Sequence, residues 1–227
     1  MLNNYDRIAT NYDRLSRLVF GKSIVRAQRS LLPAIAPRSR ILIVGGGTGW
    51  ILEEISRLHA SGLVIDYVEI SSNMLDLARE RDCKANRVAF IHMAIENYAA
   101  PAPYDVIMTP FLFDNFSRPR AQEVFDKLNY YLKPGGQWLF TDFHIDKGTN
   151  RLWQKALLRS MYIFFRNISR VEADQLPDMQ AHFVQNGYQL TFESYHFGRF
   201  IRSAAYRKSG DGGSAAPENK PFVKNHD

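Results

Sequence analysis

A glycine-rich segment, Gly45-Gly46-Gly47-Thr48-Gly49, constrains the fold of this chain more than any other feature. It directly follows the short apolar run Ile41–Val44 and precedes a stretch with apolar residues at positions 51, 55 and 58, which is helical spacing. Glycines let the backbone turn sharply and approach a ligand closely, and the first turn of the following helix has unpaired N–H groups. The sequence therefore predicts a strand–loop–helix unit with a ligand-binding turn.

Strand and helix patterns alternate through residues 40–144. The apolar runs that predict further strands are Leu63–Val68, Val88–Ile91, Tyr104–Met108 and Gln137–Phe140. The segments that predict helices are Ser71–Arg81, with Ser71 as the N-cap, and about 118–132, which is closed by Lys133-Pro134-Gly135-Gly136. Such alternation predicts an α/β fold with a parallel, doubly wound sheet. After Gly187, Tyr188–Phe197 and Phe200–Tyr206 predict a terminal pair of strands.

The flanks of this unit differ from it in pattern. Residues 1–36 predict a cap of two helices, in which Tyr5 and Tyr12 repeat at a spacing of seven and share a face. Residues 150–168 predict an inserted helix that is apolar nearly all round. In residues 209–227, Gly, Pro, Ser and Asn dominate, which is typical of a disordered tail. We expect one domain over residues 1–208, followed by this tail.

Composition excludes several classes of protein. A single cysteine, Cys83, rules out an intramolecular disulfide and any multi-cysteine metal site, and we expect no metal. No apolar stretch has the length of a membrane span and the charged N-terminus is unlike a signal peptide, so we expect a cytoplasmic protein. The net charge is +6, but the basic residues are scattered, so we expect no stable nucleic-acid partner.

A carboxylate and a tryptophan narrow the choice of ligand. Glu69 ends the second predicted strand about 20 residues after Gly49, where an acid accepts hydrogen bonds from the ribose hydroxyls of a bound adenosine. Trp50 stands where the dinucleotide version of the loop needs a third small residue for close helix–strand packing. The two residues together favour an adenosine-containing cofactor and disfavour one with a pyrophosphate.

These motifs together resemble the class I S-adenosylmethionine-dependent methyltransferases over most of residues 4–145. The segments that match the family's motifs are Ile41–Gly49, Glu69–Leu75, Tyr104–Phe116 and Leu132–Gly136. Within the family, the opening Tyr5-Asp6-x-x-Ala9-x-x-Tyr12-Asp13 and the Phe111…Asn115 pair are similar to ubiquinone/menaquinone-biosynthesis C-methyltransferases. The resemblance implies a Rossmann-like, seven-stranded, mostly parallel sheet with an antiparallel terminal strand and helices on both faces.

The resemblance also implies S-adenosyl-L-methionine as the cofactor and S-adenosyl-L-homocysteine as its product. The positions that it places around the cofactor are Tyr12, Gly45, Gly47, Thr48, Gly49, Glu69, Ile70, Met74, Ala94, Ile95 and Pro110. Two positions depart from the family's pattern. Ile43 stands where the family usually has an acid, and Ala94 stands where it usually has an aspartate that binds the adenine amine.

The acceptor site is expected at the ends of the fourth and fifth strands and under the inserted helix. The residues expected there are mostly aromatic: Phe111, Phe113, Phe116, Trp153, Tyr162, Phe165 and Tyr12, with Asp114, Asp142 and His144 as the few charged or titratable groups. His144 suits a general base, and Asp142 would orient it or take the proton itself. We expect a small lipophilic or phenolic acceptor, methylated at oxygen or carbon. Two alternatives remain open: an RNA or protein methyltransferase, and a catalytically weak protein that only binds the cofactor.

Overall fold

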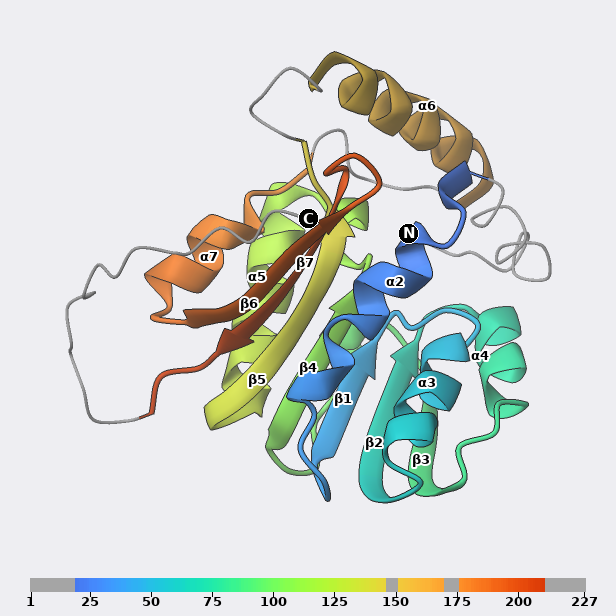
Figure 1. The fold of residues 1–227 in the computed structure, drawn as a ribbon, viewed down its shortest axis with the longest axis vertical. Helices are drawn as coiled ribbons and strands as arrows, with labels where there is room; N and C mark the ends of the chain where they lie inside the picture. Colours follow the sequence, from blue (N-terminus) through green and yellow to red (C-terminus); the bar gives the residue numbers. More distant parts are fainter. Residues whose placement is uncertain (1–18, 146–150, 170–175, 211–227) are drawn as a thin grey trace, which may run out of the picture.

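The computed structural model describes residues 19–145, 151–169 and 176–210 of the chain. Its strands are β1 (Arg40–Val44), β2 (Ser61–Glu69), β3 (Ala85–His92), β4 (Tyr104–Pro110), β5 (Leu132–Phe143), β6 (Gln189–His196) and β7 (Ile201–Arg207). They form one sheet in the order β3-β2-β1-β4-β5-β7-β6 (Figure 1). The first five strands are parallel, and β7 is antiparallel to both β5 and β6. The expected seven-stranded, mostly parallel sheet is therefore confirmed.

Helices cover both faces of this sheet. On one face lie α2 (Ser23–Arg29), α3 (Trp50–Leu58) and α4 (Ser72–Arg79), and on the other lie α5 (Arg118–Tyr131) and α7 (Met179–Gln185). Because side chains alternate along a strand, Ile41 and Ile43 of β1 pack toward α3, whereas Leu42 and Val44 pack toward α5. This burial on both faces explains why β1 reads as a continuous apolar run.

The inserted helix, α6 (Arg151–Ser169), lies beyond the carboxyl ends of the parallel strands (Figure 1). Its bounds differ by one residue at each end from the helix predicted over residues 150–168. The helix has apolar residues on its outer face as well, but it is buried on one side only. Leu158 and Tyr162 are buried, whereas Leu152 is 80% exposed. Gln154 is also buried, and its side-chain amide donates a hydrogen bond to the carbonyl oxygen of Gly198 in the turn between β6 and β7, which offsets the cost of burying the amide. The helix thus rests on the rest of the protein through one face.

Local signals in the sequence succeeded at some element ends and failed at others. Ser71 caps α4 as predicted, since its Oγ accepts a hydrogen bond from the Met74 N–H at 3.2 Å. The segment Lys133–Gly136, predicted as a loop, belongs to β5, because Gly135 and Gly136 exchange backbone hydrogen bonds with Lys208. Helix α7 was not predicted, because its seven residues are too few to show a helical period.

Parts of the predicted cap and tail lie outside the described residues. Of the cap over residues 1–36, the structure describes α2 and a short 3-10 helix, η1 (Leu32–Ala34), while residues 1–18 are not described. Residues 211–227 are likewise not described. Among the described helices, none combines the length and the apolar composition that crossing a membrane requires.

Candidate active site

A cavity of about 450 Å³ lies at the carboxyl ends of the central strands. The order of the sheet reverses between β1 and β4, and α/β folds place their ligands outside such a reversal. The wall of the cavity is assembled from segments far apart in the sequence. They are α2, the loop after β1, the start of α4, the 3-10 helices η2 (Ile95–Asn97) and η3 (Phe113–Asn115), and α6.

Glu69 holds the glycine loop against the end of β2. Its Oε2 accepts a hydrogen bond from the Gly47 N–H at 3.1 Å, and its Oε1 accepts one from the Ser71 N–H at 2.9 Å. Gly47 has a positive φ of 63°, a conformation that glycine adopts without strain. The carboxylate is buried but lines the cavity. Because a carboxylate oxygen accepts more than one hydrogen bond, Glu69 can bind ligand hydroxyls while it holds the loop.

Gly49 allows two helices to pack closely and is not part of the cavity wall. It is the N-cap of α3 with a φ of 76°, and a Cβ at this position would lie 2.6 Å from the Cβ of Ala78 on α4. Gly49 does not line the cavity. The structure therefore places this predicted cofactor contact between two helices, where its small size lets α3 begin beside α4.

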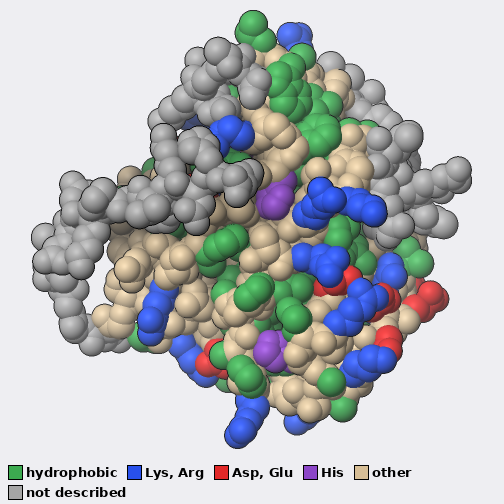
Figure 2. Space-filling model, in the orientation of Figure 1, with side chains coloured by type: hydrophobic (Ala, Val, Ile, Leu, Met, Phe, Trp, Pro, Cys, Tyr) green, Lys and Arg blue, Asp and Glu red, His purple; other side chains and the backbone are tan. Residues whose placement is uncertain are grey.

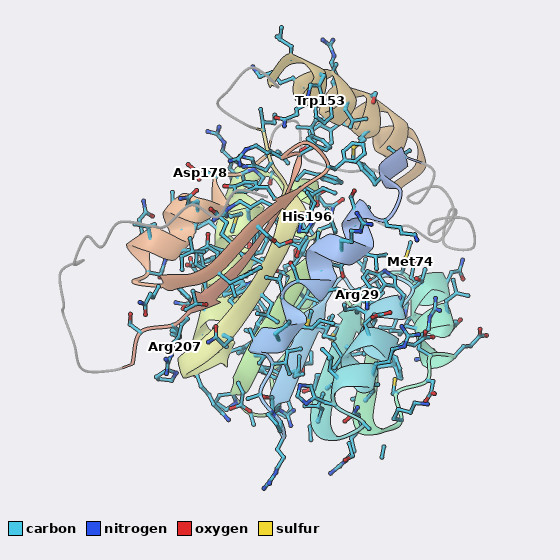
Figure 3. The ribbon with its side chains drawn as sticks, in the orientation of Figure 1. Arg29, Met74, Trp153, Asp178, His196 and Arg207 are labelled. Carbon is cyan, nitrogen blue, oxygen red and sulfur yellow. The ribbon has the colours of Figure 1, made fainter. Side chains whose placement is uncertain are left out.

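The other predicted cofactor residues that the structure describes all line the cavity. They are Gly45, Gly47, Thr48, Glu69, Ile70, Met74, Ala94, Ile95 and Pro110. Met74, on the first turn of α4, and Ile95, on η2, are almost fully buried and give this part of the wall an apolar surface (Figure 3 labels Met74). Tyr12 lies outside the described residues.

The remaining wall is mainly aromatic and aliphatic. Phe111, Phe116 and Tyr162 line it as predicted, and Phe143, which was not predicted, packs its ring 4.9 Å from that of Phe111. The Tyr162 hydroxyl donates to the carbonyl oxygen of Asp114 at 3.3 Å, which ties α6 to η3. This part of the cavity suits a ligand with apolar or ring surface.

Two aromatic residues predicted in the acceptor site do not line the cavity. Phe113 is fully buried in the core, with its ring centroid 6.1 Å from that of Phe140. Trp153 lies on α6 over the β6–β7 turn, with its ring centroid 5.9 Å from that of Phe197 (Figure 3). The side chain of Phe165 lies outside the described part of the chain. Helical and strand spacing placed these residues near the site but could not tell which way their rings turn.

His144, predicted as the base, is not part of the cavity wall. Strand β5 ends at Phe143, and the next backbone N–H, that of His144, donates to the Phe200 carbonyl oxygen at 2.7 Å. The imidazole ring lies 5.3 Å from the ring of Tyr195 on β6. Its chain position after β5 suggested the acceptor site, but the backbone turns it toward the antiparallel strands. The geometry does not support a contact between His144 and the acceptor.

Asp142 is buried directly behind the wall rather than in it. Its Oδ2 accepts hydrogen bonds from the N–H groups of Phe113 at 3.1 Å and Asp114 at 3.2 Å, and its Oδ1 accepts one from Phe143 at 2.8 Å. Burial raises the pKa of Asp142 to about 7. Burial and the neighbouring charge of Asp142 raise the pKa of Asp114, which does line the cavity, well above its usual range.

Some residues of the wall were missed in the sequence. Phe20, Ile24 and Gln28 line the cavity from the N-terminal side, and their spacing of four residues was a usable signal of one helical face. Arg120 of α5 donates to Glu96 of η2 at 2.5 Å and lies over the Phe116 ring, so it enters the wall already paired. No local pattern connects two such distant segments.

Among the described residues, no group of acids, histidines and cysteines is arranged to hold a metal ion.

Comparison with known proteins finds relatives among methyltransferases. Residues 41–136 match the model of the methyltransferase domain family. The malonyl-acyl-carrier-protein O-methyltransferase of Halalkalibacterium halodurans is 34% identical over 114 residues, which cover 48% of this chain and 41% of that protein. The ubiquinone/menaquinone biosynthesis C-methyltransferase of Stutzerimonas stutzeri is 27% identical over 158 residues, which cover 67% of this chain and 60% of that protein. The chain thus spans less than two thirds of either relative.

The solved structures include proteins of the same fold. Magnesium protoporphyrin IX methyltransferase from Synechocystis, determined with bound SAH, superimposes with a TM-score of 0.62. The superposition covers 90% of this chain and 98% of that one at 15% sequence identity. At this identity the likeness establishes the shared fold.

Proposed function

Because residues 41–136 form a class I S-adenosylmethionine-dependent methyltransferase domain near the ubiquinone/menaquinone-biosynthesis group, we propose that the chain methylates a small lipophilic or aromatic acceptor at oxygen or carbon. The observation that carries this proposal is a single cavity whose wall joins a glycine loop and a buried carboxylate to a set of aromatic side chains. One part suits the cofactor and the other suits an apolar acceptor.

The residues of the glycine-loop part fit S-adenosylmethionine. Glu69 already accepts two backbone hydrogen bonds that fix its carboxylate, so it is oriented to receive the ribose hydroxyls. Met74 and Ile95 provide apolar surface for the adenine ring. At Ala94 the chain lacks a side-chain acceptor, so backbone groups of Ala94 and Ile95 would hold the adenine amine edge. When bound, the cofactor supplies a methyl group on a positively charged sulfur, which reacts with a nucleophile by direct displacement.

The protein's own contribution is then alignment, exclusion of water and removal of a proton. Phe111, Phe143 and Tyr162 surround the acceptor with apolar surface, and α6 covers it from above the strand ends. A phosphodiester or other strongly charged group would be costly to bury there, because Arg120, the one basic residue among the described wall residues, is already paired with Glu96.

The surface also favours a small acceptor over RNA. On the face drawn in Figure 2, Lys and Arg side chains lie among acidic and apolar ones. Around α3 they form ion pairs, with both Arg29 and Arg57 bound to Glu54. Nucleic-acid binding needs basic groups gathered into a patch that can meet phosphates, and paired arginines are less available for this.

Two measurements test the proposal. In a thermal melt, S-adenosylhomocysteine should raise the melting temperature and NAD should not, because a ligand that binds only the folded state stabilises it and Trp50 lies where a pyrophosphate-binding loop needs a small residue. With methyl-labelled S-adenosylmethionine, 1,4-dihydroxynaphthalene should become labelled and bulk transfer RNA should not. Equal melting shifts from both ligands, or label in RNA alone, would contradict the proposal.

A further inference from the structure

Asp114 lines the cavity and Asp142 lies buried behind it, and we propose that Asp114 is the base that takes the acceptor's proton, with Asp142 as the residue that positions it. This assignment rests on the proposed methyl transfer and names a residue for its proton step. It replaces His144, which the structure places beside Tyr195 and outside the wall.

Asp114 is the acid on the wall that is not committed to another role. The described charged residues of the wall are Glu69, Glu96, Asp114 and Arg120. Glu69 holds the glycine loop, and Glu96 is bound to Arg120. No ion pair to Asp114 occurs among the described residues; its Oδ1 accepts a hydrogen bond from the Asn115 side chain at 2.8 Å.

The neighbours of Asp114 also place it on the acceptor side. It lies on η3, between the wall residues Phe111 and Phe116, and its carbonyl oxygen accepts the hydrogen bond from Tyr162 of α6. An acceptor that rests against these rings would therefore lie within reach of the carboxylate. A general base must first meet this geometric condition.

Asp142 fixes the backbone that carries this carboxylate. One of its oxygens accepts both the Phe113 and the Asp114 N–H groups, so the first turn of η3 is held from behind by β5. Tyr162 holds the same turn from the α6 side. Asp114 is thus supported from two elements, which is the arrangement that a catalytic group needs to keep its orientation.

The electrostatic surroundings of Asp114 make its carboxylate more basic than an exposed aspartate. The groups that face this part of the wall are Asp142 from β5, Asn115 on η3, Tyr162 from α6, and the Arg120–Glu96 pair from α5 and η2. Burial and the like charge of Asp142 both disfavour ionisation of Asp114 and so raise its pKa. A raised pKa makes the carboxylate a stronger base toward a weakly acidic phenol.

The proton step balances without a further reactant. The acceptor hydroxyl gives its proton to a carboxylate oxygen of Asp114, and the electron pair of the O–H bond stays on the acceptor. The acceptor oxygen, or a ring carbon conjugated with it, forms the bond to the methyl carbon. The methyl–sulfur bond breaks at the same time, and its electron pair remains on sulfur as a neutral thioether.

The test compares Asp114→Asn and Asp142→Asn with wild type and with Asp76→Asn, which removes an exposed carboxylate on α4. Turnover of 1,4-dihydroxynaphthalene with labelled S-adenosylmethionine is measured from about pH 5.5 to 9, beside calorimetric binding of S-adenosylhomocysteine. Asp114→Asn should lower kcat about 10²-fold or more and leave the Kd within about twofold. Asp76→Asn should change neither.

Asp142→Asn separates a positioning role from a merely structural one. Removing the like charge lowers the pKa of Asp114, so the rising limb of kcat/KM should move to lower pH while the enzyme stays active on its plateau. Carboxyl carbon NMR gives a readout that needs no acceptor: Asp114 should titrate above the usual range in wild type and lower in Asp142→Asn.

The outcomes separate the two proposals. Full turnover by Asp114→Asn, or an Asp114 carboxyl that titrates in the ordinary aspartate range, would overturn the assignment of the base and leave the methyltransferase proposal intact. Failure of wild type to bind S-adenosylhomocysteine would instead overturn the proposed function.

Discussion

Replacement of Glu69 by alanine tests the part of the site that the proposed function depends on most. In the structure, this carboxylate accepts hydrogen bonds from Gly47 and Ser71 and lines the cavity. The alanine variant therefore removes an acceptor from two backbone N–H groups and, under the proposed function, from the ribose of the cofactor. We expect weaker binding of S-adenosylhomocysteine together with lower stability.

The size of both effects follows from the hydrogen bonds involved. Loss of the contacts to the ribose should weaken binding by roughly 1–3 kcal/mol, which corresponds to a Kd about 5- to 150-fold higher. The stranded Gly47 and Ser71 N–H groups would each cost about 1–3 kcal/mol if they stayed dry. Because both lie next to a cavity that water can enter, we expect the free energy of unfolding to fall by only about 1–3 kcal/mol in total.

Calorimetry with S-adenosylhomocysteine and a chemical denaturation curve measure the two quantities separately. Glu69→Gln keeps one acceptor oxygen and nearly the same volume, so its Kd should lie between those of wild type and Glu69→Ala. Glu80→Ala, which removes an exposed carboxylate at the end of α4, should bind like wild type. A folded Glu69→Ala variant whose Kd stays within about twofold of wild type would refute the reasoning, because the carboxylate could not then contact the ligand.

Three further predictions concern other parts of the molecule. Gly49→Ala should destabilise the protein by more than Gly135→Ala, because both glycines have a positive φ but only the Cβ at position 49 would overlap Ala78, while the one at 135 would meet nothing within 4 Å. Equal decreases in the free energy of unfolding would contradict the packing role of Gly49. His144→Ala should leave kcat nearly unchanged, since the ring lies outside the cavity wall; a loss of about 10²-fold would restore the histidine as the base. Deletion of residues 211–227 should preserve a cooperative melt and the binding of S-adenosylhomocysteine, because that segment has no apolar period to bury. Loss of the cooperative melting transition would show that the segment is part of the domain that we propose over residues 1–208.

Much of the fold was predictable from the sequence because its signals are local. The apolar run before Gly45 is short and continuous, since β1 is buried on both faces. The start of β5 was not predictable in the same way. Lys133–Gly136 has the composition of a turn, and it becomes a strand only because Lys208 pairs with it from the far end of the chain.

The candidate site was also predictable from the sequence only in part. The predicted cofactor residues of the described chain line the cavity, apart from Gly49, because each lies in or beside a loop at a strand end, and parallel strands bring those ends together. The acceptor side was predicted less well. Phe113 and Trp153 have the right residue type and the right place in the chain, but their rings turn into the core and toward the β6–β7 turn.

The sequence by itself determined the order of strands and helices apart from α7, the glycine loop and the acid at the end of β2, because each depends on residues that are neighbours in the chain. Only the tertiary structure decided that Asp114 lines the cavity while Asp142 supports it from behind and His144 turns away. The hydrogen bonds and burial that separate these three roles join η3, β5 and the antiparallel strands, and no periodicity within a segment records which of its residues will meet a distant one.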